Sequence, residues 1–286
     1  GQVGIAYYYP WLERIEQIEY EAEFPYTTLT FSDTDMPLEI DLRVYSPFIP
    51  HDVKNSSLPG VYFDFKVRNT STKKVNVFLI SSLRNLVGYD RTDKYFTSEI
   101  IEGDNYKYFN LGAGGMEEDY PSYGNMGMAS LSGESTYYLG WEHKHPYYER
   151  LVVENEFPNI DDTKGRNVVD KETGKKMGRI AKKFTKDQRH FSSIGITKNL
   201  HKDEAFEHSF LMTWNFPNAY GSHNVQEGME PIDWLKDDDY WVKQTKTTNI
   251  GNYYNNFFKD AAEVADYMVE NREDLFQRTN QFFTDY

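Results

Sequence analysis

The 286-residue sequence predicts a mainly β protein built from layered sheets and ending in a long helix. Three observations lead to this fold class. Several segments alternate apolar and polar side chains with the period of two that half-buried strands show. One further segment is apolar on both sides, as in a strand covered by two layers. From Phe258 onward the apolar residues recur every three to four positions, which is the spacing of one helix face.

The first three predicted strands each carry apolar side chains at every second position. These positions are Ile18, Tyr20 and Ala22, then Leu38, Ile40, Leu42 and Val44, then Val61, Phe63, Phe65 and Val67. A turn at residues 69–74 follows, and Val75, Val77 and Leu79 resume the apolar side to complete a hairpin. Phe78 and Ile80 make the opposite side apolar too, so we expect this strand to lie inside a layered structure.

The chain before the third strand is irregular, because prolines interrupt it. Pro47, Pro50 and Pro59 each lack a backbone donor and favour an extended conformation in the residue before them. We therefore expect Ser46 to Leu58 to form a stiff loop beside the sheet.

The middle of the sequence is less regular. Residues 103–127 are rich in Gly, Asn and Tyr and indicate loops between short strands, whereas LSGESTYYLGWE indicates a turn at Ser132-Gly133 followed by a strand. Residues 159–190 are polar and charged and are predicted to leave the sheet. Alternation returns from Phe206 to Phe216.

The last segment is predicted to be one helix over about residues 255–284. Its length would be roughly 43 Å at a rise of 1.5 Å per residue. Because that is long for an element that closes a sheet domain, we interpret the helix as a connector.

Composition excludes several classes of function. The chain has 31 basic and 45 acidic residues and a formal charge of −14, so it lacks the positive charge that general nucleic-acid binding requires. No apolar run reaches the roughly 18 residues of a membrane span, which predicts a soluble chain. The absence of cysteine excludes disulfides, thiolate nucleophiles and cysteine-ligated zinc.

Candidate chemical groups are sparse. His143 and His145 would point to one side of a strand, but two imidazoles are half a metal site, and surface or aromatic packing is the alternative. His208 lies on the apolar side of its strand, where we expect a hydrogen-bonded core histidine rather than a base. Residues 237–239 are three aspartates between Trp234 and Trp241, and a solvated loop is favoured over a calcium or sugar site. We expect no cofactor and no metal, and no catalytic motif is visible.

Two stretches carry a resemblance to a known family. The segment YSPFIPHDVKNSSLPGVYFDFKVRNTS starts at Tyr45, and FLMTWNFPN starts at Phe210 and precedes GNYYNNFFKDAAEVADYMVENREDLFQRTNQFF. Both resemble segments of the N-terminal domain of glycoside hydrolase family 116. This family includes bacterial β-glucosidases and the non-lysosomal glucosylceramidase, also called bile acid β-glucosidase.

The resemblance implies an N-terminal β-sandwich of two large antiparallel sheets, joined by a helix to a C-terminal (α/α)6 barrel. We therefore expect a sandwich over residues 1–254 and a helical linker over 255–286. In that family the glutamate nucleophile and the aspartate acid/base lie in the barrel, so no catalytic residue is carried over to this chain. The Gly-rich opening of the family's domain is not seen before Ile5, so we expect the chain to begin partway into the domain.

The expected function is that of a non-catalytic domain of a retaining β-glycosidase, which supports and orients the barrel and shapes the rim of its cleft. Alone the chain is expected to be inactive. Its partner would be the C-terminal catalytic domain of the same protein, and a β-glucoside or glycolipid would be reached through that domain. Nine residues are candidates for binding or interdomain contact: Ser46, Pro47, Phe48, Pro50, His51, Trp214, Asn215, Pro217 and Asn218.

The same expectation includes apolar side chains on the exposed flank of the C-terminal helix, where a barrel would pack. The alternative is a free-standing carbohydrate-binding module that uses Trp141, Trp214, Trp234 or Trp241 as a stacking platform. A third possibility is a complete small hydrolase with two acids facing each other across a pocket. The sequence leaves the sugar, the oligomeric state and the compartment open.

Overall fold

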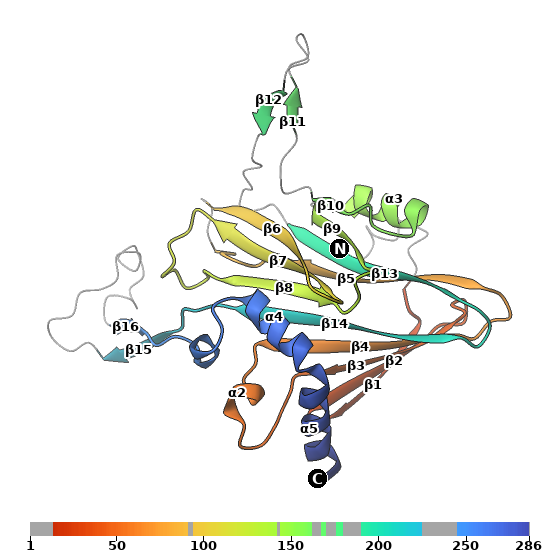
Figure 1. Ribbon diagram of the computed structural model, residues 1–286, viewed down its shortest axis with the longest axis horizontal. Helices are drawn as coiled ribbons and strands as arrows, with labels where there is room; N and C mark the ends of the chain where they lie inside the picture. Colours follow the sequence, from red (N-terminus) through yellow and green to blue (C-terminus); the bar gives the residue numbers. More distant parts are fainter. Residues whose placement is uncertain are drawn as a thin grey trace.

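The computed structural model describes residues 14–90, 94–141, 144–161, 167–169, 176–179, 190–224 and 245–285. Two sheets of unequal size face each other (Figure 1). The larger sheet has eight strands in the order β1 (Gln17–Glu23), β2 (Tyr26–Ser32), β3 (Leu38–Tyr45), β4 (Gly60–Asn69), β14 (Ala205–Asn215), β8 (Asn125–Ser130), β7 (Lys107–Gly114) and β6 (Tyr95–Glu102). The smaller sheet has four strands in the order β10 (Ile160–Asp161), β9 (Thr136–Trp141), β13 (Phe191–Leu200) and β5 (Val75–Arg84). The predicted two-sheet β-sandwich is confirmed.

Neighbouring strands in both sheets run antiparallel, except that β10 lies parallel to β9. Two short ladders lie outside these sheets and pair β11 (Asn167–Val169) with β12 (Lys176–Arg179) and β15 (Tyr220–Asn224) with β16 (Thr245–Asn249). The helical elements are α2 (Val53–Ser56), α3 (Lys144–Glu154), η3 (Tyr253–Asn256), α4 (Ala261–Glu270) and α5 (Arg272–Asp285).

The alternation of β4 has a direct structural meaning. Phe63 and Phe65 point into the space between the sheets and pack against a cluster that contains Phe210 from β14 and Ile194 from β13. Tyr62, on the other side of the strand, is fully buried and packs under α4 and α5. Both sides of β5 are also covered, as predicted, because Phe78 and Ile80 belong to the cluster beneath α3.

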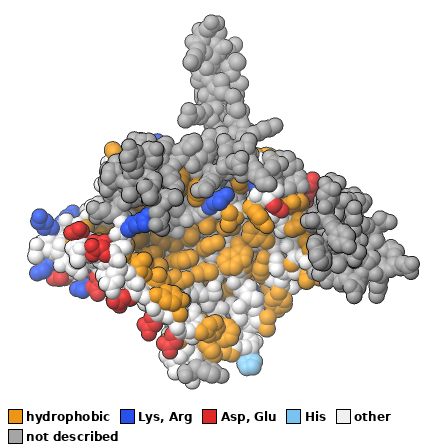
Figure 2. Space-filling model, turned by 180° about the vertical axis from the view of Figure 1, so that it is seen from behind, with side chains coloured by type: hydrophobic (Ala, Val, Ile, Leu, Met, Phe, Trp, Pro, Cys, Tyr) orange, Lys and Arg blue, Asp and Glu red, His pale blue; other side chains and the backbone are white. Residues whose placement is uncertain are grey.

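The unequal sheets leave part of the apolar surface uncovered. The edge strand β5 packs against β3 and β4, so among the described residues no strand of the smaller sheet lies opposite β1. All seven residues of β1 are exposed, with Ile18 at 52% and Tyr20 at 66%. The strand prediction for this segment is therefore right and its half-burial is wrong. Seen from the side opposite to α4, hydrophobic side chains gather across the middle of the molecule (Figure 2).

The single C-terminal helix predicted from periodicity is wrong, because the segment forms two helices after a 3-10 turn. The carboxylate of Asp260 accepts a hydrogen bond from the Glu263 backbone N–H at 2.8 Å, so α4 begins at Ala261 and not near residue 255. Asn271 ends α4, and its side-chain amide donates to the Tyr267 carbonyl at 2.8 Å. Both helices pack on the outer face of the eight-stranded sheet.

Two further expectations are corrected. The Gly-rich stretch 103–127 contains β7, a full eight-residue strand in the large sheet. Residues 160–161, within the predicted charged excursion, rejoin the small sheet as β10 beside β9. Within the described residues, no helix has both the length and the apolar character needed to cross a bilayer.

Candidate functional site

The proline-rich loop between β3 and β4 is held by its own hydrogen bonds. Ser46 donates from its hydroxyl to the Gly60 carbonyl at 2.8 Å, and the Ser56 hydroxyl donates to the Ile49 carbonyl at 2.8 Å and accepts from the Ile49 N–H at 2.9 Å. Pro47, Ile49 and Leu58 are buried beneath it. The loop is therefore a folded unit that starts and ends on the sheet.

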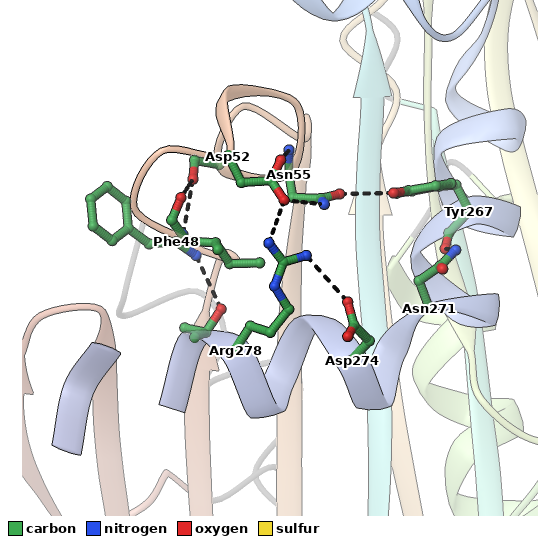
Figure 3. A network of polar contacts seen from close by, with 10 residues as sticks. Phe48, Asp52, Asn55, Tyr267, Asn271, Asp274 and Arg278 are labelled. Atoms are coloured by element: carbon green, nitrogen blue, oxygen red, sulfur yellow. Dashed lines mark hydrogen bonds and ion pairs between the residues drawn. The ribbon is translucent and has the colours of Figure 1, made fainter. Parts of the chain in front are cut away.

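A polar network joins this loop to the two C-terminal helices (Figure 3). Arg278 of α5 donates to Asp52 at 2.6 Å, and Tyr267 of α4 donates to the Asn55 side-chain oxygen at 2.9 Å. The Phe48 N–H donates to the hydroxyl of Thr279 at 3.2 Å. Hydrogen bonds from Asn55, reinforced by Arg278, hold the pKa of the Asp52 carboxyl below its usual value. The loop and the helices therefore form one rigid unit.

Aromatic side chains extend this unit to the C-terminal end of α5. Phe48 lies between Phe24 and Phe282, with ring centroids 4.9 Å and 5.0 Å away. Phe24 is 66% exposed, and Val53 on α2 is 61% exposed. Pro50 and His51 are exposed as well, and His51 has a φ of 64°. The loop thus presents apolar side chains to solvent near the point where the chain leaves α5.

The second predicted segment, Trp214 to Asn218, lies directly beside the first, because β14 pairs with β4. The Trp214 N–H donates to the Pro59 carbonyl at 3.0 Å. Asn215 is buried and its amide donates to the Phe258 carbonyl at 3.2 Å. Pro217 is half-buried, and Asn218 donates to the carbonyls of residues 118 and 120 at 2.8 Å each. The two motifs are therefore neighbours on one sheet, and both hold the segment that leads into α4.

Sequence reasoning missed a third anchor, at the start of α5. Asp64 accepts hydrogen bonds from Arg272 at 3.0 Å, from Arg43 at 3.2 Å and from the Ser209 hydroxyl at 2.6 Å. The Arg43 guanidinium also lies 4.7 Å from the centre of the Phe276 ring. These groups border an open cavity of about 510 Å³ on the outer face of the large sheet. The alternation of β4 placed Asp64 on the polar side, but no local signal identified its partners.

The exposed flank of the C-terminal helices is polar, contrary to expectation. None of the exposed large hydrophobic side chains lies in α4 or α5. The solvent-facing positions of α5 are Glu273, Asp274, Gln277, Arg278, Gln281, Thr284 and Asp285. The apolar residues of both helices point inward because the sheet below them is itself apolar.

Comparison with known proteins identifies the family. A sequence profile described as beta-glucosidase 2, glycosyl-hydrolase family 116 N-term, matches residues 6–275. The chain belongs to this family. It is thus an N-terminal domain associated with a glycosidase, as the resemblance implied. No curated protein matches the chain.

Solved structures show weak likeness to this family 116 N-terminal domain. Heparan sulfate lyase HepC from Pedobacter heparinus aligns with a TM-score of 0.33 and 10% identity, over 84% of this chain and 28% of the lyase. A galactose mutarotase related enzyme from Lactobacillus acidophilus aligns with a TM-score of 0.30 and 10% identity, over 69% of this chain and 71% of that enzyme. A putative aldose 1-epimerase from Klebsiella pneumoniae subsp. pneumoniae aligns with a TM-score of 0.28 and 9% identity, over 69% and 53%.

The sequence-based predictions for the histidines of the family 116 domain are confirmed for His208 but not for the pair His143 and His145. His208 is a buried core histidine, as predicted, and its Nε2 lies 2.7 Å from the Ser130 hydroxyl. Burial, with smaller effects from Lys198 and Arg272, lowers the pKa of His208 to about 4. His143 lies outside the described residues, and His145 lies in helix α3, so the strand geometry behind the paired-histidine hypothesis is wrong.

The tryptophans that the structure describes do not form the exposed stacking platforms that the alternative of a carbohydrate-binding module requires. Trp141 is 6% exposed, stacks between Tyr147 and Phe191, and donates from its indole N–H to Ser193 at 2.9 Å. Trp214 is half-buried and packs against the core between the sheets. Trp234 and Trp241, with the aspartates between them, lie outside the described residues.

Proposed function

We propose that this family 116 domain is non-catalytic and that it supports and orients a catalytic domain following α5 in the same protein. We place the sandwich at residues 1–254 and the linker at 255–286. The observation that carries the proposal is the attachment of α4 and α5 to the sandwich. α5 would fix the orientation of a following domain, because contacts along the helix attach it to the sandwich.

Contacts at three positions along α4 and α5 attach these helices to the sandwich. Near the end of α4, the buried Tyr62 hydroxyl donates to the Met268 carbonyl at 2.7 Å. At the start of α5, Arg272 binds Asp64, and six residues later Arg278 binds Asp52. A linker that served only as a tether would need none of these contacts.

The exposed end of the proline-rich loop supplies a contact surface for the following domain. We assign Phe48, Pro50 and His51, with Phe24 and Val53, to this surface. Phe24 and Val53 expose apolar side chains, Pro50 and His51 are exposed on the same loop as Val53, and the half-buried Phe48 packs with Phe24 against Phe282 near the end of α5. Ser46, through its hydrogen bond to the Gly60 carbonyl, the buried Pro47 and the segment Trp214 to Asn218 support it. We further propose that the surface shapes the rim of the cleft in which a β-glucoside or glycolipid is bound by the catalytic domain.

The experiment compares hydrolysis of a chromogenic β-glucoside by the 286-residue chain and by the same chain extended through the following domain. Activity in the longer protein alone is expected. Replacing Phe24 and Val53 together by serine should then reduce the activity of the longer protein, whereas Val153→Ser, at an exposed position of α3 over the smaller sheet, should leave it unchanged. Turnover by the 286-residue chain would refute the non-catalytic assignment.

A further inference from the structure

Loops at one end of the sandwich border an open cavity that the supporting role does not use. The cavity measures about 360 Å³, within the range of small-molecule sites. Its lining comes from the loop after β5, the loop before β8 and the exit of β14, and consists of Leu86, Tyr89, Asp90, Pro121, Ser122 and Phe216.

The loop that carries Tyr89 is built as a rigid turn. The buried amide of Asn85 donates to the Gly112 carbonyl at 2.8 Å, and its oxygen accepts from the Val87 N–H at 2.9 Å. Gly88 has a φ of +60°, a left-handed backbone conformation that is strained for residues with a side chain, and a Cβ there would lie 2.3 Å from the Met116 sulfur. Its N–H donates to the Ser122 carbonyl at 2.9 Å.

This rigid turn leaves its largest side chains in solvent. Tyr89 is 69% exposed and Leu86 is 43% exposed, although Val87 between them is fully buried. The opposite wall is also fixed, because the Phe216 carbonyl accepts hydrogen bonds from Asn252 at 2.7 Å and from Tyr254 at 3.0 Å. A preformed pocket that exposes an aromatic ring loses little conformational entropy when it binds a ligand.

The polar group of the pocket is the carboxylate of Asp90. It accepts from the Ser122 hydroxyl at 2.6 Å and from the Tyr120 hydroxyl at 3.1 Å. A carboxylate has about four acceptor positions, so about two remain for hydroxyl groups of a ligand. An anionic ligand would be repelled by Asp90 and by the formal charge of −14.

We propose that this cavity binds one ring of a neutral pyranoside sugar. The apolar C–H face of the ring packs on Tyr89 and the neighbouring apolar walls, and its hydroxyls donate to Asp90. This chemistry differs from the tryptophan platforms expected from the sequence. Sugar binding in this cavity is independent of the supporting role, because it requires only the 286-residue chain and no catalytic domain.

The test is a titration of the 286-residue chain with methyl β-D-glucopyranoside, followed by saturation-transfer NMR. We expect transfer to the ring protons of the sugar, and binding about tenfold weaker in Tyr89→Ala. Tyr20→Ala is the matched control, because Tyr20 is 66% exposed on the edge strand β1 and should leave the dissociation constant unchanged. Thermal unfolding of both variants verifies that they fold.

A second probe tests the role of charge. Methyl β-D-glucuronide, in which a carboxylate replaces the hydroxymethyl group of the same ring, should bind several-fold more weakly than the glucoside, and Asp90→Asn should narrow that difference in affinity. The proposal is overturned if the glucoside shows no transfer, if Tyr89→Ala binds it as well as the original chain does, or if the glucuronide binds more tightly.

Discussion

The packing of α4 on the large sheet is tested most directly by a double-mutant cycle at Gly60 and Met268. Met268 is fully buried in the cluster between the helices and the sheet. A Cβ on Gly60 would lie 2.3 Å from its sulfur and 3.0 Å from its terminal methyl carbon. Gly60 and Met268 therefore share one small space.

The magnitudes follow from this geometry. Met268→Ala leaves a cavity and should lower the free energy of unfolding by about 3 kcal/mol. Gly60→Ala should lower it by about 1 to 3 kcal/mol, because the new methyl group overlaps the Met268 side chain. In the double variant the overlap is gone and the methyl group fills part of the cavity, so the total loss should be at least about 1 kcal/mol smaller than the sum.

The assay is urea unfolding of the four proteins, followed by tryptophan fluorescence at constant pH. The free energy of interaction is the difference between the double variant and the sum of the single variants. Strict additivity would refute the reasoning, because it would mean that α4 does not pack on β4 at Gly60. The packing contact that is proposed to orient the following domain would then have been assigned to the wrong residues.

Three further predictions concern charged and titratable groups. His208 has a folded-state pKa of about 4, below its unfolded value of 6.5, so the stability that is present above pH 6.5 is lost as the pH falls. The free energy of unfolding should therefore be about 2 kcal/mol smaller at pH 5 than at pH 7. His208→Gln should remove the contribution of His208 to this pH dependence. Asp64→Asn should lower the free energy of unfolding by about 1 to 2 kcal/mol, because two arginines then share a neutral amide, and an unchanged urea midpoint would contradict this anchor. Arg278→Ala breaks an exposed ion pair and should lower the free energy of unfolding by less than about 1 kcal/mol. It should nevertheless reduce the β-glucosidase activity of the extended protein more than the control Arg150→Ala on α3 does. Equal activities of the two variants would argue against orientation through α5.

Much of the fold could be predicted from local sequence. The alternations at β3, β4 and β14 correspond to strands whose two sides face different layers. The prolines between β3 and β4 indicated the rigid loop, and His208 was recognised as a core residue from its position on the apolar side. These predictions succeed because strand alternation, proline geometry and burial depend on short stretches of chain.

Predictions failed where a local pattern allowed more than one outcome. The apolar periodicity after Phe258 continues through two helices, and only the caps at Asp260 and Asn271 divide them. The alternation of β1 is as regular as that of β4, but β1 lies at the edge of an eight-stranded sheet that, in the described part of the chain, a four-stranded sheet faces. Periodicity records which side is apolar and not whether another layer covers it.

The sequence by itself determined the β-rich class, the stiff loop at Ser46 to Leu58 and membership of the family. Only the tertiary structure decided which side chains meet. Asp64 finds its partners 21, 145 and 208 residues away, and Tyr62 bonds to a carbonyl 206 residues away. The physical reason is that strand order places β4 beside β3 and β14 and under α5, and strand order is a property of the whole sheet. The Tyr89 cavity likewise exists because three loops distant in sequence end at one edge of the sandwich.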